Sequence, residues 1–520
     1  MIKRLLILTL PIFCYLLTGT STPAQSVSTA VCPENGKLIC TLPELYGPNG
    51  LQQKIGPLLG GAASGTGHQG GHFEESFFSS LTPLNAAVGS QLTLLPLGSP
   101  GSGLVYVYNP TLKTFTASTE DLGPILTERA NTVGRHKIRL GFTYQRFSFG
   151  TLDGSSLHSL PASFLHIDDA GSNGVPDSTN GVQVPAGTNC TIKPDPTKPG
   201  DSNTGLCGFV RDRIDTVNDI NLTLNQYTLT GTFGLTRRID VSIAIPIINV
   251  TMSAKSVATI INNGNDNDHQ FNVNNQFVTS CVGTPCRQAT FLNSDNATGI
   301  GDIVLRAKGV VWSGERAAVA VAADLRVPTG DEQNYLGSGT IGFTPFVVAS
   351  YAARVSPHVN VGYEVNGNSV LAGTIVAPTA TTASSLTTGH LPNQFLYSGG
   401  VDVAILPKRL AGTFDFIGQR VINAQRARVT TQSFLGACGP AGLAPLDTAN
   451  SNGYCTSPDP NVSQPALNGT RSSFNILSAA LGAKVRISDK FIVFGNALFK
   501  LDDGGLRARV VPLVGASFSF

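Results

Sequence analysis

The feature that most constrains this chain is a series of twelve segments in which apolar and polar residues alternate. Each segment is typical of a strand with one apolar and one polar face, because successive side chains of a strand point to opposite sides. Twelve is an even number, as single-chain bacterial barrels require. The sequence therefore predicts an all-β fold, a transmembrane antiparallel β-barrel, with strands at residues 138–144, 220–235, 239–247, 303–312, 317–327, 340–354, 359–365, 395–405, 410–421, 474–487, 491–501 and 506–520.

The links between these segments alternate in length. Tight links follow the second, fourth, sixth, eighth and tenth segments, and long links follow the first, third, fifth, seventh and ninth. Outer-membrane barrels have short periplasmic turns and longer extracellular loops. A soluble β-sandwich needs no such alternation, so the link lengths favour a membrane barrel over residues 135–520.

The C-terminus has the pattern of a closing barrel strand. Residues 506–520 alternate up to the last residue, which is aromatic. The spacing of Gly515, Phe518 and Phe520 resembles the signal read by the bacterial barrel-assembly machinery, although Leu513 stands where that signal has a polar residue. An ordinary buried C-terminal strand is the alternative interpretation.

The N-terminus has the pattern of an export signal. Lys3 and Arg4 precede an apolar run at residues 5–17, and small residues follow up to Ala24. This order is typical of a secretory signal peptide, so we assign residues 1–24 to export and exclude them from the fold. No other apolar run approaches the roughly 20 residues of a spanning helix.

The charge content also favours a membrane barrel. Charged residues make up 13% of the chain, against about 25% in soluble domains. Without Lys3 and Arg4, 33 basic residues balance 33 acidic ones. A formally neutral chain offers no broad attraction for nucleic acid. We therefore expect the partners to be outer-membrane lipid, the barrel-assembly machinery and a small-molecule solute.

Without Cys14, eight cysteines remain in four close pairs. In an oxidising compartment such pairs predict local disulfides. Metal binding is the alternative, but the sequence has no Cys-x-x-Cys motif and no histidine close enough to complete a tetrahedral set. We expect no metal and no other cofactor. The disulfide candidates are Cys32, Cys40, Cys190, Cys207, Cys281, Cys286, Cys438 and Cys455.

In such a barrel, one face of each strand points to the lipid and the other face points into the lumen. Ile, Val, Leu, Phe and Ala are expected to face lipid, and charged residues the lumen. Opposite charges in the lumen either brace the wall or line a path for solute. The lumen-lining candidates are Asp302, Arg306, Lys308, Asp324, Arg326, Glu364, Asp402, Asp415, Lys484, Arg486, Lys500, Arg507 and Arg509.

Residues 25–134 lack the barrel pattern. They are rich in Gly and Pro but also contain aromatic residues and an apolar stretch at 92–97. We predict a plug or hatch that enters the barrel. Two extra strands and a periplasmic extension are the alternatives.

Catalysis has little support in the sequence. No Gly-x-Ser-x-Gly nucleophile turn occurs. An outer-membrane phospholipase would need a strand histidine on the outer wall beside a serine. The main strand histidine, His358, is expected to point into the lumen instead, so we predict that the protein is not an enzyme.

Three stretches, residues 299–308, 324–331 and 356–363, carry a family resemblance. They resemble the outer-membrane proteins of the meta-pathway of phenol degradation family. The resemblance implies a bacterial outer-membrane transporter, distantly similar to the barrels that carry fatty acids and aromatic hydrocarbons past an N-terminal hatch. We therefore expect passive passage of small, hydrophobic or aromatic solutes. An open, weakly selective porin and a non-transporting barrel that binds partners at the surface are the alternatives.

Overall fold

The structure is a computed structural model of the chain. It describes residues 32, 36–46, 53–54, 74–95, 106–109, 114–117, 126–165, 213–261, 276–277, 281–282, 287–376, 385–406, 409–435 and 461–520. The predicted signal peptide lies outside the described residues, as do Cys190, Cys207, Cys286, Cys438 and Cys455.

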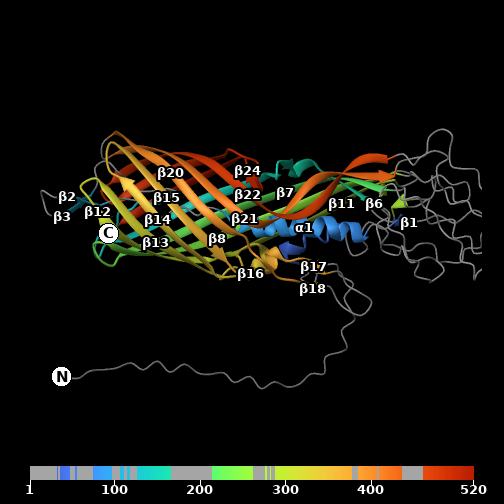
Figure 1. Ribbon diagram of the computed structural model, residues 1–520, viewed down its shortest axis with the longest axis horizontal. Coiled ribbons are helices and arrows are strands. Elements are labelled where there is room, and N and C mark those ends of the chain that lie inside the picture. The colour runs from blue at the N-terminus through green and yellow to red at the C-terminus, as the bar shows by residue number, and fades with distance from the viewer. Residues whose placement is uncertain are drawn as a thin grey trace, which may run out of the picture.

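Twelve antiparallel strands form a closed barrel, which confirms the predicted fold class (Figure 1). Closure is made by pairing of the last strand with the first. Two strands consist of consecutive segments, because β11 and β12 both pair with β8, and β24 and β25 both pair with β4. The wall consists of β4 (Ile138–Leu152), β7 (Arg213–Gly234), β8 (Ile239–Ile261), β11 (Gln288–Ile300), β12 (Ile303–Ser313), β13 (Ala317–Val327), β14 (Gly342–Tyr351), β15 (Val355–Asn366), β20 (Asn393–Leu406), β21 (Leu410–Leu435), β22 (Asn461–Ser488), β23 (Phe491–Lys500), β24 (Leu506–Ala508) and β25 (Val510–Ser519).

Short turns gather at one end of the barrel. The links that follow β7, β12, β14, β20 and β22 have two to four residues. Short turns mark the periplasmic end of an outer-membrane barrel. The opposite, outer end is extended by four strands, β7, β8, β21 and β22, which are much longer than the alternating segments predicted from the sequence.

Strand β7 shows that the barrel has two tiers. Toward the periplasmic end, Tyr227, Leu229 and Phe233 are exposed on the outside, while inward-facing threonines and Gln226 are buried. Toward the outer end the polarity is reversed, because Leu222 and other inward-facing apolar side chains are buried. Strand β8 repeats this reversal, with exposed isoleucines in its first half and buried apolar residues in its second.

We call the two parts the membrane tier and the outer tier. On β8 the membrane tier covers residues 239–247 and the outer tier residues 248–261. Nine residues match the length of a tilted spanning strand. The prediction that all apolar strand residues face lipid is wrong for the outer tier. In that tier the apolar side chains of the wall point inward and are buried.

A polar ladder on the outer surface marks the boundary between the tiers. Tyr144 Oη donates to Asn225 Oδ1 at 3.0 Å, and Asn225 Nδ2 donates to Asn249 Oδ1 at 3.1 Å. Asn249 Nδ2 in turn donates to Thr298 Oγ1 at 2.8 Å. Below this ladder the outward side chains of β7 and β8 are apolar, and above it most of them are polar. The apolar band below the ladder places the protein in the bacterial outer membrane.

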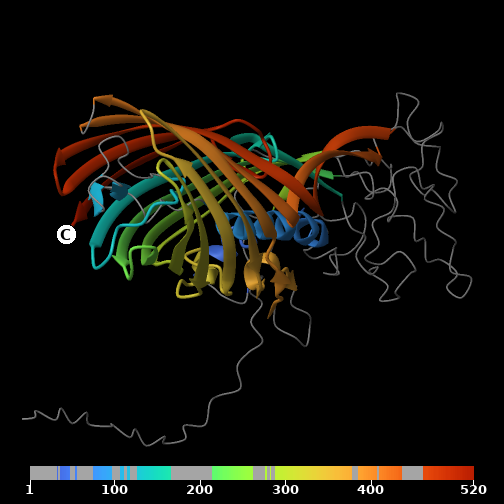
Figure 2. The same cartoon turned by 60° about the vertical axis from the view of Figure 1, so that its left-hand side comes forward.

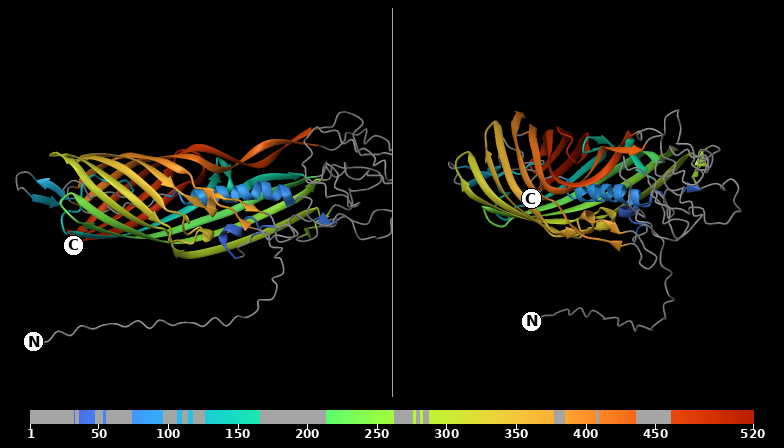
Figure 3. Two further views of the ribbon diagram at one scale, coloured as in Figure 1. Left: turned by 60° about the horizontal axis from the view of Figure 1, so that its bottom comes forward. Right: turned by 45° about the vertical axis from the view of Figure 1, so that its right-hand side comes forward.

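The outer tier encloses a hydrophobic core that includes N-terminal residues. Helix α1 (Glu74–Leu92) packs against β21 and β22, and its residues Leu81, Leu84 and Val88 are buried. Figures 2 and 3 show the helix within the curve of the extended strands. Contact is close where the Pro83 ring meets Gly469, since a Cβ at Gly469 would lie 2.3 Å from Pro83 Cβ. No helix in the described part of the chain is both long and apolar enough to span a membrane.

The described residues before 135 add no strand to the wall. Three of their short strands form two-stranded sheets outside it, β1 (Gln53–Lys54) with β9 (Gln276–Phe277) and β2 (Tyr106–Asn109) with β3 (Thr114–Ala117). The remaining small elements are η1 (Leu38–Cys40), β5 (Ser155–Ser156), η2 (Leu157–Ser159), β6 (Leu160–Leu165), β10 (Cys281–Val282), η3 (Glu332–Asn334), β16 (Asn368–Ser369), η4 (Val370–Ala372), β17 (Ile375–Val376), β18 (Ser385–Leu386) and β19 (Gly389–His390).

Candidate functional site

The lumen of the membrane tier is crossed by the residues that precede the first strand. We call residues 127–129 the latch, because their side chains bind charged groups of the wall from several strands. The chain continues along the lumen to the periplasmic rim, where Val133 N donates to Asp240 Oδ2 at 3.0 Å. The barrel interior is therefore occupied at both tiers, by α1 in the outer tier and by the latch in the membrane tier.

Glu128 binds two cations of β12. Its Oε2 lies 2.6 Å from Arg306 Nη1, and its Oε1 lies 3.0 Å from Lys308 Nζ. Arg306 also makes a two-pronged bond to Asp324 on β13, with distances of 2.6 and 2.7 Å. Such bidentate pairs are strong and fix the guanidinium plane. Glu128 therefore joins a charge pair that the wall already holds.

Arg129 forms a deeply buried ion pair with a carboxylate of the barrel wall. Its Nη2 lies 2.6 Å from Asp402 Oδ2 on β20, and both side chains are at most 2% exposed. Lys484 Nζ on β22 lies 3.3 Å from the other oxygen of the same carboxylate. Arg129 Nη1 also donates to Thr127 Oγ1 at 2.8 Å, which holds the latch in one conformation.

Thr127, the third residue of the latch, contacts His358 of the barrel wall. Its Oγ1 lies 2.9 Å from His358 Nε2, which is 2.6 Å from Asp415 Oδ1. The His358 side chain, on β15, is fully buried against Asp415 of β21. The Nε2 atom of His358 therefore contacts both Asp415 and Thr127 of the latch.

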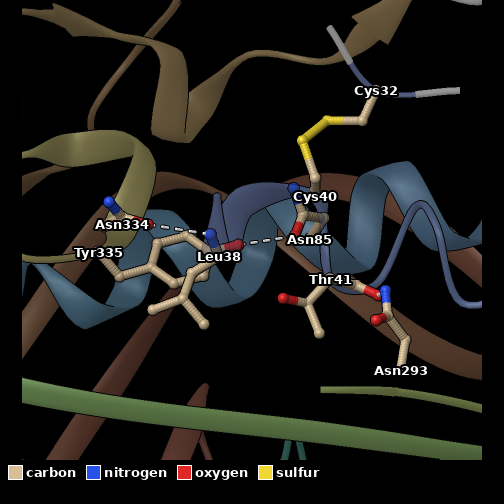
Figure 4. The surroundings of a disulfide bond; sticks show 8 residues. All are labelled: Cys32, Leu38, Cys40, Thr41, Asn85, Asn293, Asn334 and Tyr335. Carbon is tan, nitrogen blue, oxygen red and sulfur yellow. Dashed lines mark hydrogen bonds between the residues drawn. A yellow bond between two sulfur atoms is a disulfide. The ribbon is translucent and has the colours of Figure 1, made fainter. Parts of the chain in front are cut away.

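A second set of contacts holds the N-terminal residues at the outer end (Figure 4). Lys37 Nζ lies 2.8 Å from Asp331 Oδ2, and Leu38 N donates to Asn334 Oδ1 at 3.2 Å. Tyr335 Oη donates to Asn85 Oδ1 of α1 at 2.7 Å, and burial raises the pKa of this phenol. We call this group the clasp, because it joins the connection between β13 and β14 to both N-terminal pieces.

A disulfide joins Cys32 to Cys40 beside the clasp (Figure 4). One of the four predicted pairs is therefore present. Cys281 is the first residue of β10, but its predicted partner lies outside the described residues. The other two predicted pairs lie entirely outside them and stay predictions.

The clasp gives a prediction about acid pH. Partial burial alone would raise the pKa of Asp331, but hydrogen bonds from Lys37 and Asn334 outweigh this and lower it. A lowered pKa contributes stability above the unfolded value of about 4, and that stability is lost as the pH falls through the lowered value. Because the Asp331 side chain is 37% exposed, we expect the contribution to be at most about 1 kcal/mol.

The measurement is the free energy of unfolding of the wild type and of Asp331→Asn from pH 7 to pH 2.5. The wild type should be more stable at neutral pH, and the difference should vanish at the acid end. A difference that persists at pH 2.5 would show that the carboxylate charge does not contribute.

A cavity of about 310 Å³ lies between α1 and the latch, at the level where the two tiers meet. One part of its wall is apolar and includes Leu95, Leu126, Leu224, Ile248, Leu371 and Ile417. The other part is charged and includes Glu128, Asp302, Arg306, Asp324, Arg326 and Glu364. The cavity is thus amphipathic and large enough for a small organic molecule.

The guanidinium of Arg326 organises the charged wall of the cavity. Its Nη1 lies 3.0 Å from Glu364 Oε1, its Nη2 binds the Asn366 side chain, and its Nε lies 3.8 Å from Asp302 Oδ2. Asp302 also accepts hydrogen bonds from the backbone of Gly330 and Ser338. The connection between β13 and β14 is therefore hydrogen-bonded to Asp302 of the cavity wall.

The predicted lumen residues differ in where the structure places them. Asp302, Arg306, Asp324, Arg326 and Glu364 come together around the cavity. Lys308, Asp402, Asp415 and Lys484 lie below it and contact the latch or its partners.

Arg507 and Arg509 at the closing strand have different surroundings, against the prediction that both line the lumen. Arg507 is buried and donates to Ser478 Oγ at 2.9 Å, whereas Arg509 is exposed. The register shifts between Arg507 and Ala508, within β24, and the simple alternation is broken there.

The sequence did not point to Thr127, Glu128 and Arg129. These residues lie in an irregular segment, so no periodicity marks their orientation. Their wall partners are 178 to 288 residues away in the chain. We find no local sequence signal that identifies them.

The closed barrel and its apolar outer band define the class of outer-membrane β-barrel proteins. A family model with the description "MetA-pathway of phenol degradation" matches residues 211–403, which confirms the resemblance seen in the sequence. A comparison with curated proteins gives no match.

Solved outer-membrane proteins show distant similarity to the chain. An outer membrane channel from Pseudomonas putida F1 is 8% identical, with a TM-score of 0.38, over 75% of this chain and 98% of that one. A Pseudomonas aeruginosa FadL homologue is 10% identical, with a TM-score of 0.26, over 74% of this chain and 89% of that one. The NanC porin is 7% identical, with a TM-score of 0.24, over 53% and 93%.

Proposed function

We propose that the protein passes small hydrophobic or aromatic solutes passively across the outer membrane, with residues 25–134 acting as a plug. The observation that carries the proposal is the amphipathic cavity in the lumen between α1 and the latch. A cavity that combines an apolar part with converging polar groups is typical of a small-molecule site.

Passage toward the periplasm requires the latch to move. The wall does not depend on the latch for its backbone hydrogen bonds, because each wall strand pairs with its neighbours. The latch is held by side-chain contacts with Arg306, Lys308, Asp402 and Asp415. Its release would therefore open the lumen and leave the barrel intact.

Two further features support parts of this proposal. His358 bonds to Asp415 and the latch, which favours a structural role over a catalytic one.

The Phe518 and Phe520 rings meet edge to face at 4.7 Å, and Phe520 is exposed at the end of the chain. An exposed terminal aromatic, with Gly515, would suit recognition by the barrel-assembly machinery.

The proposal is tested by solute entry into intact cells that carry a lipopolysaccharide outer leaflet. We expect expression of the protein to speed the entry of radiolabelled benzyl alcohol, while entry of the trisaccharide raffinose stays unchanged. Entry of raffinose would favour an open, weakly selective porin. Failure of both solutes to enter faster would favour a surface barrel that does not transport.

A further inference from the structure

The β15–β20 part of the cavity wall contains a glutamine with a fixed orientation. Gln394 is 1% exposed, and its Nε2 donates to Glu364 Oε2 at 2.7 Å. Glu364 Oε1 lies 3.0 Å from the Arg326 guanidinium, and an ionised carboxylate has no donor of its own, so Glu364 can only accept hydrogen bonds. The amide nitrogen of Gln394 must therefore face Glu364, and the amide oxygen Oε1 must point away from it.

That oxygen is a buried acceptor with no donor. Among the residues that the structure describes, none donates to Gln394 Oε1. The same is true of Asn360 Oδ1 on the same wall, whose Nδ2 donates to Ser398 Oγ at 3.1 Å. Most buried amide oxygens have a partner, so an unpartnered one at a cavity needs an explanation. Both residues line the cavity between α1 and the latch.

The charged groups of the cavity favour the same kind of ligand. Four carboxylates line it, those of Glu128, Asp302, Asp324 and Glu364, against the two guanidinium groups of Arg306 and Arg326. Both guanidinium groups are already bound to carboxylates of the wall. Arg326 Nε has no hydrogen-bond partner among the described residues, but the lining contains more carboxylates than guanidinium groups, so an anionic solute would be repelled by the surplus of negative charge.

We propose that the cavity selects an amphipathic solute that carries a hydrogen-bond donor, a hydroxyl or an ammonium group, on a small apolar body. The donor binds Gln394 Oε1 or Asn360 Oδ1, and the apolar body contacts side chains such as Leu126 and Ile417. Carboxylate solutes are excluded, because they carry the same charge as the surplus carboxylates of the lining. This inference rests on the proposed transport function and specifies its solute.

Four probes of similar size separate the effects of donor and charge. Radiolabelled benzyl alcohol, benzylamine, toluene and benzoate are each dialysed against the full mature protein in detergent micelles, with empty micelles as the blank. We expect benzyl alcohol and benzylamine to bind about fivefold or more tightly than toluene, the effect of one hydrogen bond. Benzoate should bind most weakly.

A matched pair of variants tests the acceptor itself. Gln394→Met keeps the length of the side chain and removes the oxygen, so the preference for benzyl alcohol over toluene should disappear. Gln145→Met is the control. Gln145 is also 1% exposed with an unpartnered Oε1, but it lies outside the cavity wall. The preference should persist in the control.

The outcomes separate this inference from the proposed function. Benzoate binding as tight as that of benzyl alcohol would overturn the inference, and so would a preference that survives in folded Gln394→Met. Transport would stand in either case if benzyl alcohol still enters cells. Absence of binding by all four probes overturns the inference as well, and it removes the proposed function only when uptake is also absent.

Discussion

Arg129→Gln is expected to convert a closed channel into one that opens frequently. The substitution removes the guanidinium that binds Asp402 at 2.6 Å in a site where both side chains are at most 2% exposed. Breaking a buried ion pair typically costs about 3–5 kcal/mol. Lys484 still neutralises Asp402, so we expect the lower end of this range. About 3 kcal/mol would raise the open fraction more than a hundredfold.

Single-channel conductance in planar bilayers measures this effect. The wild type should be mostly closed, and Arg129→Gln should show frequent long openings. Arg509→Gln is the control, because it makes the same change at an exposed arginine near the other end of the barrel wall. A folded Arg129→Gln protein that stays closed would show that the latch does not control the pore.

The membrane tier could be predicted from the sequence for a clear physical reason. Lipid on one side and a polar lumen on the other require alternation at every second residue, and residues 239–247 follow it. The outer tier keeps the same period, but its polarity is reversed in the part of β7 before Asn225 and in the part of β8 after Ile247. A rule that places apolar residues in lipid cannot predict such a reversal, because it assumes one environment along the whole strand.

The site could be predicted only in part. Charged residues at even spacing in the strands indicated a charged lumen, and the structure places Arg306 and Asp324 as direct cross-strand partners. The latch could not be found, because it has no regular structure and its bonds join residues far apart in the chain. The cavity depends on α1 and the latch together, so neither segment alone reveals it.

Leu84→Ala is expected to release helix α1 from the outer tier. Leu84 is fully buried in the core formed with the extended strands. Removing a buried leucine side chain costs about 2–5 kcal/mol. The helix has little stability of its own to offset this, because Pro83 interrupts its interior hydrogen bonds. Most of its stability must therefore come from packing.

Hydrogen exchange of the α1 backbone amides measures the release. Exchange should become about 30-fold to several thousand-fold faster in Leu84→Ala, as the loss of about 2–5 kcal/mol requires. Leu292→Ala is the control, since Leu292 lies on β11 of the same tier and is 72% exposed. Its α1 exchange should match the wild type. If Leu84→Ala exchanges like the control, the outer core does not hold the helix, and the plug must be retained by the latch and the clasp alone.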